Sequence, residues 1–181
     1  MVFISSNFLV CCVLFMNYMS DKNILDRVLQ RKGYKLSEIE SSISVRLDIK
    51  PEWIPDKNVE AKKTINKIVL EKNNTEVILD KVSHRGHDIY FIFDVVPNMN
   101  YKGGLLLHNT VINSDGSYST NFPEDVYKIV DTKGDDLDYG QHGYGPEAKF
   151  GFAIDLEHYD KIRNGFTVKY KGLILYEYSK N

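Results

Sequence analysis

Residues 64–97, TINKIVLEKNNTEVILDKVSHRGHDIYFIFDVVP, decide the fold class of this 181-residue chain. The stretch holds three runs rich in β-branched and aromatic residues, which favour strands. Asn73-Asn74 and Arg85-Gly86 separate the runs, and both pairs are typical of the tight turns in hairpins. The third run is apolar on both faces, as expected for a strand at the centre of a sheet. The stretch therefore predicts three consecutive antiparallel strands.

Further strand-like runs continue to the end of the chain, and no long helical pattern separates them. They occupy residues 105–122, 126–130, 149–156 and 166–178. The last run is either a hairpin at Lys171-Gly172 or one long strand with a glycine bulge. Short strands at this spacing indicate a mainly β fold, with an antiparallel β-sandwich over residues 59–181.

The segment ahead of these strands, residues 21–58, predicts a helical and linker lead-in. Apolar residues recur there at helical spacing, at Ile24, Leu25, Val28 and Leu29. Ser20 or Asp21 would cap this helix. Residues 34–49 fit a helix at first and then a strand, and a proline-containing linker follows. We therefore expect one or two short helices before the sandwich.

Residues 1–20 form an apolar segment typical of a signal or membrane anchor. The run from Phe8 to Met16 has the length of a signal-peptide core, although no positive residue precedes it. Residues 2–19 are therefore expected to contact a membrane. Two alternatives stay open: translation starts at Met16 or Met19 and gives a cytoplasmic protein, or the run is a buried strand of the fold.

Composition narrows the classes of function. Twenty-three Lys and Arg against 25 Asp and Glu give a formal charge of −2, which argues against nucleic-acid binding. Cys11 and Cys12 are the only cysteines and both lie in the apolar segment, so the rest of the chain has no thiol for a nucleophile, a zinc site or a disulfide. The sequence has no phosphate-binding loop, dinucleotide fingerprint or nucleophile elbow, and we expect no catalytic residue.

The stretch 64–96 resembles the opening strands of immunoglobulin-like extracytoplasmic domains found in bacterial membrane-anchored and anti-sigma-factor-like proteins. The closing run FTVKYKGLILYEY, residues 166–178, is similar to the strand that ends such domains. The resemblance implies an immunoglobulin-like β-sandwich outside the cytoplasmic membrane, membrane-associated or secreted. It also implies a binding, sensing or spacer module without catalysis.

Residues 131–149, DTKGDDLDYGQHGYGPEAK, are the most unusual stretch in composition. Calcium prefers carboxylate and carbonyl oxygens, and the candidate ligands are Asp135, Asp136, Asp138 and Glu147. Three of them match the first, third and twelfth positions of an EF-hand loop, but Gln141 stands where that loop needs glycine. A solvated acidic turn is the simpler interpretation, so no cofactor is required and calcium is the alternative.

The same loop carries three rings between glycines, those of Tyr139, His142 and Tyr144. Aromatic rings on glycine-rich loops bring apolar area at a low entropic cost and stack on sugars or peptides. We therefore expect a protein or carbohydrate ligand to bind here. The alternative is a loop that binds nothing.

The remaining histidines have structural interpretations. His84 and His87 flank the turn at Arg85-Gly86, where a cross-strand pair at an exposed tip is expected rather than a metal site. His108 is expected to be a hydrogen-bonded residue of a strand, and His158 to lie in a solvated turn.

Together these patterns predict a non-catalytic extracytoplasmic β-sandwich with a binding, sensing or structural role. The first alternative is a cytosolic interaction protein that starts near Met19 and docks through the apolar side of its first helix, at residues 24–29. The second is a calcium-dependent or carboxylate-based hydrolase, because carboxylate pairs leave no short motif.

Overall fold

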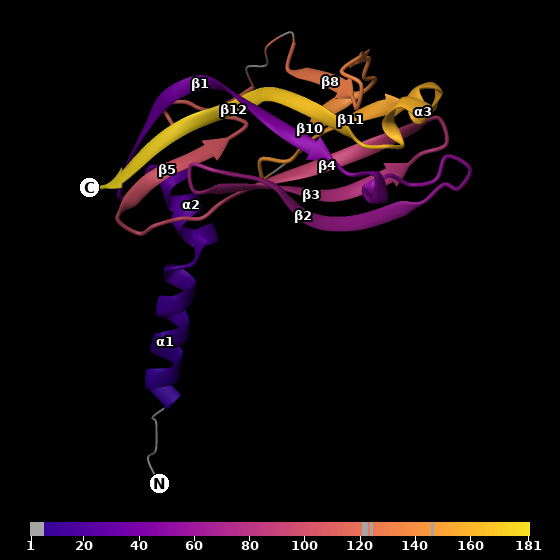
Figure 1. Cartoon of the computed structure of the whole chain (residues 1–181). Coiled ribbons are helices and arrows are strands. Elements are labelled where there is room, and N and C mark those ends of the chain that lie inside the picture. The colour runs from indigo at the N-terminus through magenta and orange to yellow at the C-terminus, as the bar shows by residue number, and fades with distance from the viewer. Residues whose placement is uncertain (1–5, 121–122, 124, 146) are drawn as a thin grey trace.

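The computed structural model describes residues 6–120, 123, 125–145 and 147–181. Two antiparallel five-stranded sheets pack against each other (Figure 1). The β12 sheet has the order β1 (Tyr34–Ile49), β12 (Phe166–Lys180), β8 (Tyr127–Asp131) and β9 (Asp136–Leu137), and β5 (Gly103–His108) also pairs with β12. The β4 sheet has the order β10 (His142–Tyr144), β11 (Phe150–Asp155), β4 (Asp88–Pro97), β3 (Thr75–His84) and β2 (Lys62–Lys72). The predicted mainly β class, with two packed antiparallel sheets, is confirmed.

The remaining elements are short. A two-stranded hairpin consists of β6 (Val111–Ile112) and β7 (Tyr118–Ser119). The N-terminal helices are α1 (Ser6–Tyr18) and α2 (Asp21–Leu29), and α3 (Tyr159–Ile162) lies between β11 and β12. Single turns of 3-10 helix occupy Pro51–Trp53 and Leu156–His158. Of the one or two short helices expected over residues 21–58, α2 is present.

The central stretch forms β2, β3 and β4 as predicted. Asn73 and Asn74 adopt φ values of 49° and 56°, the left-handed conformation that a tight hairpin turn requires. In β4, the alternating side chains of Ile89, Phe91 and Phe93 are fully buried. They face the other sheet, where the ring of Phe91 meets that of Phe166 in β12 edge to face, at 5.2 Å between centroids. Aromatic packing of this kind fills the space between the two sheets.

A bulge in β12 allows this strand to contribute side chains to two separate hydrophobic cores. Ile43 pairs with Leu173 and Val45 with Tyr170, so two residues of β1 span three of β12. The extra residue changes which side chains face inward: Tyr170 and Leu173 both lie in the main core. A Cβ atom at Gly172 would lie 2.5 Å from Cζ of Tyr170, so the bulge needs glycine here. The glycine-bulge interpretation is confirmed, and the hairpin is not formed.

The second core lies beyond the bulge, under α2. Its buried residues come from α2, β12 and neighbouring strands: Ile24, Val28, Leu29, Tyr34, Leu36, Met99, Leu106, Ile112, Ile174, Tyr176 and Tyr178. Ser20 caps α2 as predicted, because its side chain accepts a hydrogen bond from the N–H of Asn23. Three of the four apolar residues proposed to dock on a cytosolic partner are therefore buried against this chain's own strands.

The helix expected at the start of residues 34–49 is wrong. All of this segment is strand β1, which pairs with β12 from Tyr34 opposite Lys180 to Ile49 opposite Phe166. Pairing with the long partner strand satisfies the backbone along the whole segment, and it outweighs the local helical spacing. The lead-in expected over residues 21–58 thus contributes a strand to the β12 sheet, so the sheets extend beyond residues 59–181.

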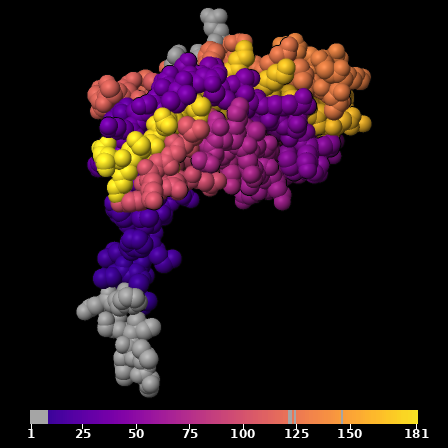
Figure 2. Space-filling view, turned by 60° about the vertical axis from the view of Figure 1, so that its left-hand side comes forward, coloured from indigo at the N-terminus to yellow at the C-terminus, as the bar shows by residue number. Residues whose placement is uncertain are grey.

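Helix α1 projects away from the sheets (Figures 1 and 2). From Leu9 to Met16, its large apolar side chains are between 53% and 72% exposed. Because residues 6–18 are helical, the alternative of a buried strand is wrong. None of the helices in the described part of the chain is long and apolar enough to cross a membrane.

Candidate functional site

A cleft of about 550 Å³ lies where α2 faces the end of β4 and the loop leading into β11. This volume is within the range of small-molecule sites. Its walls are mainly apolar and are formed by Leu25, Leu29, Val95, Val96, Pro97, Tyr118 and Ala148. The cleft therefore combines segments that lie far apart in the sequence.

The amphipathic pattern of α2 explains one wall. Ile24 and Val28 fill the second core, while Leu25 and Leu29, one position further along, line the cleft. The apolar stripe of α2 is thus wider than the surface that the strands beneath it cover. Opposite, Val96 of β4 keeps 40% of its surface exposed. Apolar surface is therefore available in the cleft for a bound molecule.

One ion pair crosses the cleft between its strands. Lys149 Nζ lies 2.8 Å from Asp94 Oδ1 and links the start of β11 to β4. The hydrogen bond that Lys149 donates to Asp94 raises the pKa of Lys149, so this ammonium keeps its charge and its partner. A second pair, between Lys22 and Glu147 at 3.6 Å, joins α2 to the loop, and both side chains are exposed.

His108 is the buried polar side chain of the cleft. It is 5% exposed, and its Nδ1 accepts a hydrogen bond from the N–H of Thr110 at 3.1 Å. Burial lowers the pKa of His108 to about 4, so the ring is neutral near pH 7. Since Nδ1 accepts, the proton is on Nε2, and no residue of the described chain hydrogen-bonds to Nε2. The predicted hydrogen-bonded strand histidine is confirmed, but its place in the cleft was missed.

The carboxylates proposed as calcium ligands do not come together into one metal site. Asp135, Asp136 and Asp138 are exposed, and Asp136 pairs with Lys128 at 3.2 Å. Glu147 instead lies at the cleft beside α2. Among the described residues, no group of three or more His, Cys, Asp or Glu side chains is placed to hold a metal ion. Calcium binding by this loop stays a prediction.

The three rings proposed to bind a ligand do come together. His142 lies 5.7 Å from Tyr139 and 6.5 Å from Tyr144 between ring centroids. Tyr139 also packs on Tyr127 of the main core at 5.3 Å. The Tyr144 hydroxyl is buried, and this burial raises the pKa of Tyr144 to about 12. Of the three, only His142 is exposed, and ligand binding here stays a prediction.

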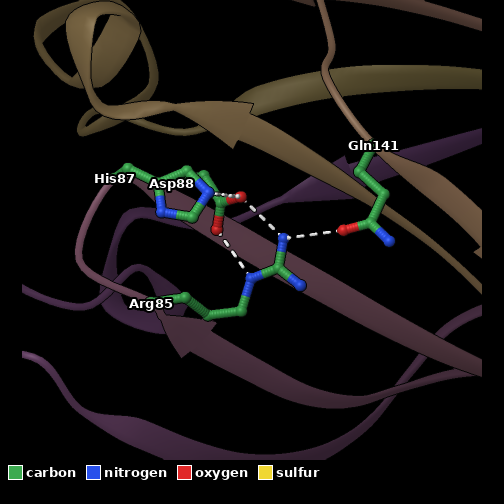
Figure 3. Close-up of polar contacts among 4 residues, drawn as sticks. All are labelled: Arg85, His87, Asp88 and Gln141. Carbon is green, nitrogen blue, oxygen red and sulfur yellow. Dashed lines mark hydrogen bonds and ion pairs between the residues drawn. The ribbon is translucent and has the colours of Figure 1, made fainter.

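A polar cluster occupies the turn between β3 and β4 (Figure 3). Asp88 is buried, and its carboxylate accepts hydrogen bonds from Arg85 and lies 3.2 Å from Nε2 of His87. Arg85 also reaches Gln141 beside β10, at 3.4 Å. The expected exposed pair of His84 and His87 is wrong, because His84 is buried while His87 is exposed. The side chains of this cluster hydrogen-bond to one another and stabilise the turn. The cleft is therefore the candidate site.

No match is found when the chain is compared with models of known protein families, with curated proteins and with solved structures. The case for a function therefore rests on the geometry of the cleft and of α1. No spacing in the sequence marked the cleft, because residues 21–29, 94–97, 108–110 and 147–149 meet only in the folded chain.

Proposed function

We propose that this protein is a non-catalytic binding or sensing module that α1 holds at a membrane. One observation carries the proposal: the exposed apolar helix α1 continues, after Met19 and Ser20, into α2, which forms a wall of the cleft. A ligand that contacts α2 would therefore act next to the membrane-bound segment. This arrangement suits a module that reports a bound ligand to the membrane side.

The exposed surface of α1 favours lipid as its surroundings. Apolar side chains are exposed from Leu9 to Met16, and the first charged residue of the chain is Asp21. A protein groove covers one face of a helix, whereas acyl chains cover every face, so a helix that is apolar on all sides is suited to a bilayer. Binding through residues 2–19 was the membrane contact predicted from the sequence.

The base of α1 carries the residues that prefer a membrane interface. The guanidinium carbon of Arg27 lies 3.7 Å from the centroid of the Tyr18 ring, and Tyr18 lies 6.2 Å from Tyr101. Nζ of Lys180 lies 3.4 Å from the centroid of Tyr101. Tyrosine rings with nearby cations are typical of the boundary between acyl chains and water. They support a bilayer surface at this end of the domain.

The fold leads us to place the domain outside the cytoplasmic membrane. Two packed antiparallel sheets are compatible with an immunoglobulin-like sandwich, and the resemblance of residues 64–96 to extracytoplasmic domains points to the same compartment. We keep the immunoglobulin-like topology as part of this proposal. The cytosolic alternative is weakened because α2 buries Ile24 and Val28 against its own domain.

Flotation with vesicles of phosphatidylcholine and phosphatidylglycerol tests the membrane attachment. The full chain is reconstituted by detergent removal and compared with Phe15→Asp, which places a charge on an α1 residue that is 64% exposed. The matched control is Val59→Asp, with the same charge on a loop residue that is 57% exposed. An aspartate in the acyl region costs about 3 kcal/mol, so Phe15→Asp should float at least about tenfold less.

Wild type and Val59→Asp should float equally, and all three proteins should melt at the same temperature. Equal flotation of Phe15→Asp would show that α1 does not enter the bilayer. A wild-type chain that stays at the bottom of the gradient would overturn the proposal and favour a cytosolic interaction protein.

A further inference from the structure

We infer that the cleft between α2 and β4 binds a small organic cation, with an apolar body, an ammonium group and one hydrogen-bond acceptor. The inference rests on the proposed role as a binding module and names the class of its ligand. It places the ligand in the cleft rather than at the rings of Tyr139, His142 and Tyr144, which do not line it.

The apolar walls select the body of the ligand. Leu25 of α2 is half-buried and Val96 of β4 is exposed, and both line the cleft. A ligand that covers these side chains gains about 25 cal/mol for each Å² of apolar surface removed from water. A compact hydrocarbon or aromatic ring therefore fits this wall better than a strongly hydrated sugar.

The charges select a cation over an anion. Four carboxylates line the cleft, those of Asp21, Asp26, Asp94 and Glu147, against the ammonium groups of Lys22 and Lys149. Four negative and two positive charges leave a net charge of −2. Both lysines already have carboxylate partners, Glu147 and Asp94 respectively. An anionic ligand would thus meet repulsion without a free cation.

Asp26 is the carboxylate available to an ammonium group. Asp21 accepts a hydrogen bond from the N–H of Met99 at 2.9 Å, which fixes its side chain toward the strands. Asp26 is exposed, lines the cleft and forms no ion pair with any described residue. An ammonium group seated beside α2 therefore gains a charge partner at Asp26 without breaking an existing pair.

His108 offers a hydrogen-bond donor to a ligand in the cleft. Its Nε2 is not among the fully buried side-chain atoms that have no partner, so this N–H group is not fully enclosed. The Nε2–H of His108 belongs to a side chain that is 5% exposed, lines the cleft, and has no hydrogen-bond partner among the described residues. A hydroxyl, ether or carbonyl oxygen of a ligand would accept its hydrogen bond.

Three probes with the same ring test the class of ligand. They are 2-phenylethylammonium, 2-phenylethanol and 3-phenylpropanoate, titrated by calorimetry into the full chain held in phosphatidylcholine nanodiscs, with empty nanodiscs as the blank. The ammonium probe should bind most tightly, the alcohol more weakly and the carboxylate most weakly. Equal affinities, or a preference for the carboxylate, would overturn the cation assignment.

Two variants and a control locate the site. Asp26→Asn should weaken the ammonium probe about fivefold and leave the alcohol unchanged, as expected for one exposed charge pair. Asp138→Asn removes the same charge from an exposed residue that does not line the cleft, and it should change neither probe. Val96→Trp should fill the cleft and abolish the binding of all three probes.

Each outcome tests a different contact of the ligand. Equal effects of Asp26→Asn and Asp138→Asn would show a general charge effect and overturn the role of Asp26. Unchanged binding in Val96→Trp, or no binding of any probe to wild type, would overturn the cleft as the site. Flotation is measured without a ligand, so it reports on the membrane attachment separately.

Discussion

Arg85 holds the carboxylate of Asp88 through two hydrogen bonds, from Nε at 2.7 Å and from Nη2 at 2.6 Å (Figure 3). The backbone N–H of Arg85 also donates to the carbonyl of Asp88 at 2.9 Å. Asp88 is buried, and the guanidinium carbon of Arg85 lies 4.4 Å from the centroid of the Tyr90 ring. These contacts fix the turn at which β4, the central strand of its sheet, begins.

Asp88→Asn should lower the free energy of unfolding by about 2 kcal/mol at pH 7, because it removes the charge from the buried partner of two hydrogen bonds that the more exposed Arg85 donates. Urea unfolding followed by tyrosine fluorescence measures the change. Asp160→Asn is the control, since its pair with Arg163 spans 3.7 Å on the surface and should contribute less than about 0.5 kcal/mol. Equal losses in the two variants would contradict the structural role of Asp88.

Acid should remove the stability that the pair of Arg85 and Asp88 contributes. The hydrogen bond from Arg85 lowers the pKa of Asp88 below its ordinary value of 3.8, so the folded state favours the ionised carboxylate. Its stabilisation is complete above pH 3.8 and is lost as the pH falls through the lower, folded pKa. The difference in free energy of unfolding between wild type and Asp88→Asn should therefore shrink from pH 7 toward pH 2. A constant difference over this range would contradict the ion pair.

Thr75 joins the two sheets by a buried hydrogen bond, because its Oγ1 accepts from the N–H of Leu107 in β5 at 2.9 Å. Thr75→Val keeps the shape but leaves that N–H unsatisfied, and it should destabilise the protein by about 2 kcal/mol. Thr75→Ser keeps the hydroxyl and loses one methyl group, so it should cost less. Thermal unfolding by circular dichroism ranks the two variants. A serine variant less stable than the valine variant would argue against the hydrogen bond.

Gly151 lets β11 lie against β4 without a side chain between them. A Cβ atom at this position would lie 2.5 Å from the backbone oxygen of Phe91, which β-sheet pairing prevents from moving. Gly151→Ala should therefore destabilise the protein by about 2–3 kcal/mol. Gly143→Ala on the neighbouring strand meets only the Tyr90 hydroxyl, at 3.4 Å, and should change stability by less than about 0.5 kcal/mol. Equal melting temperatures for the two variants would refute this reason for the glycine.

Metal removal tests the acidic loop. Because the described carboxylates form no group placed to hold a cation, EDTA should leave the melting temperature of the full chain unchanged. Addition of millimolar calcium should also leave it unchanged. A rise with calcium that Asp136→Asn abolishes would instead establish the calcium site expected at Asp135, Asp136, Asp138 and Glu147.

Local sequence patterns were sufficient to predict most of the strands. Hairpins such as the one at Asn73-Asn74 depend on neighbours in the chain, and the alternation of Phe150, Phe152 and Ile154 follows from the period of a strand. Residues 34–43 were ambiguous for the same reason. Leu36, Ile39 and Ile43 fit helical spacing, and only pairing with β12 makes the segment a strand.

The candidate site could not be predicted from local sequence patterns. Asp94 and Lys149 are 55 positions apart in the chain, and their ion pair exists because β11 packs beside β4. His108 was expected in a strand, but its burial beside α2 depends on the second core. The rings of Tyr139 and Tyr144 were expected to be available for a ligand, but both are partly buried against the main core.

The amino-acid sequence by itself determined most of the strands, their turns, the helix after Ser20 and the apolar N-terminal segment, because each depends on the period and chemistry of adjacent residues. It did not show β9 and β10, which lie within the stretch interpreted as a loop, residues 131–149. Only the tertiary structure decided that β1 is a strand throughout, that α2 buries one apolar face and offers another, and that the cleft carries a net negative lining. These features arise from contacts between distant segments. No local pattern encodes which segments will meet, since the packing of the two sheets chooses them.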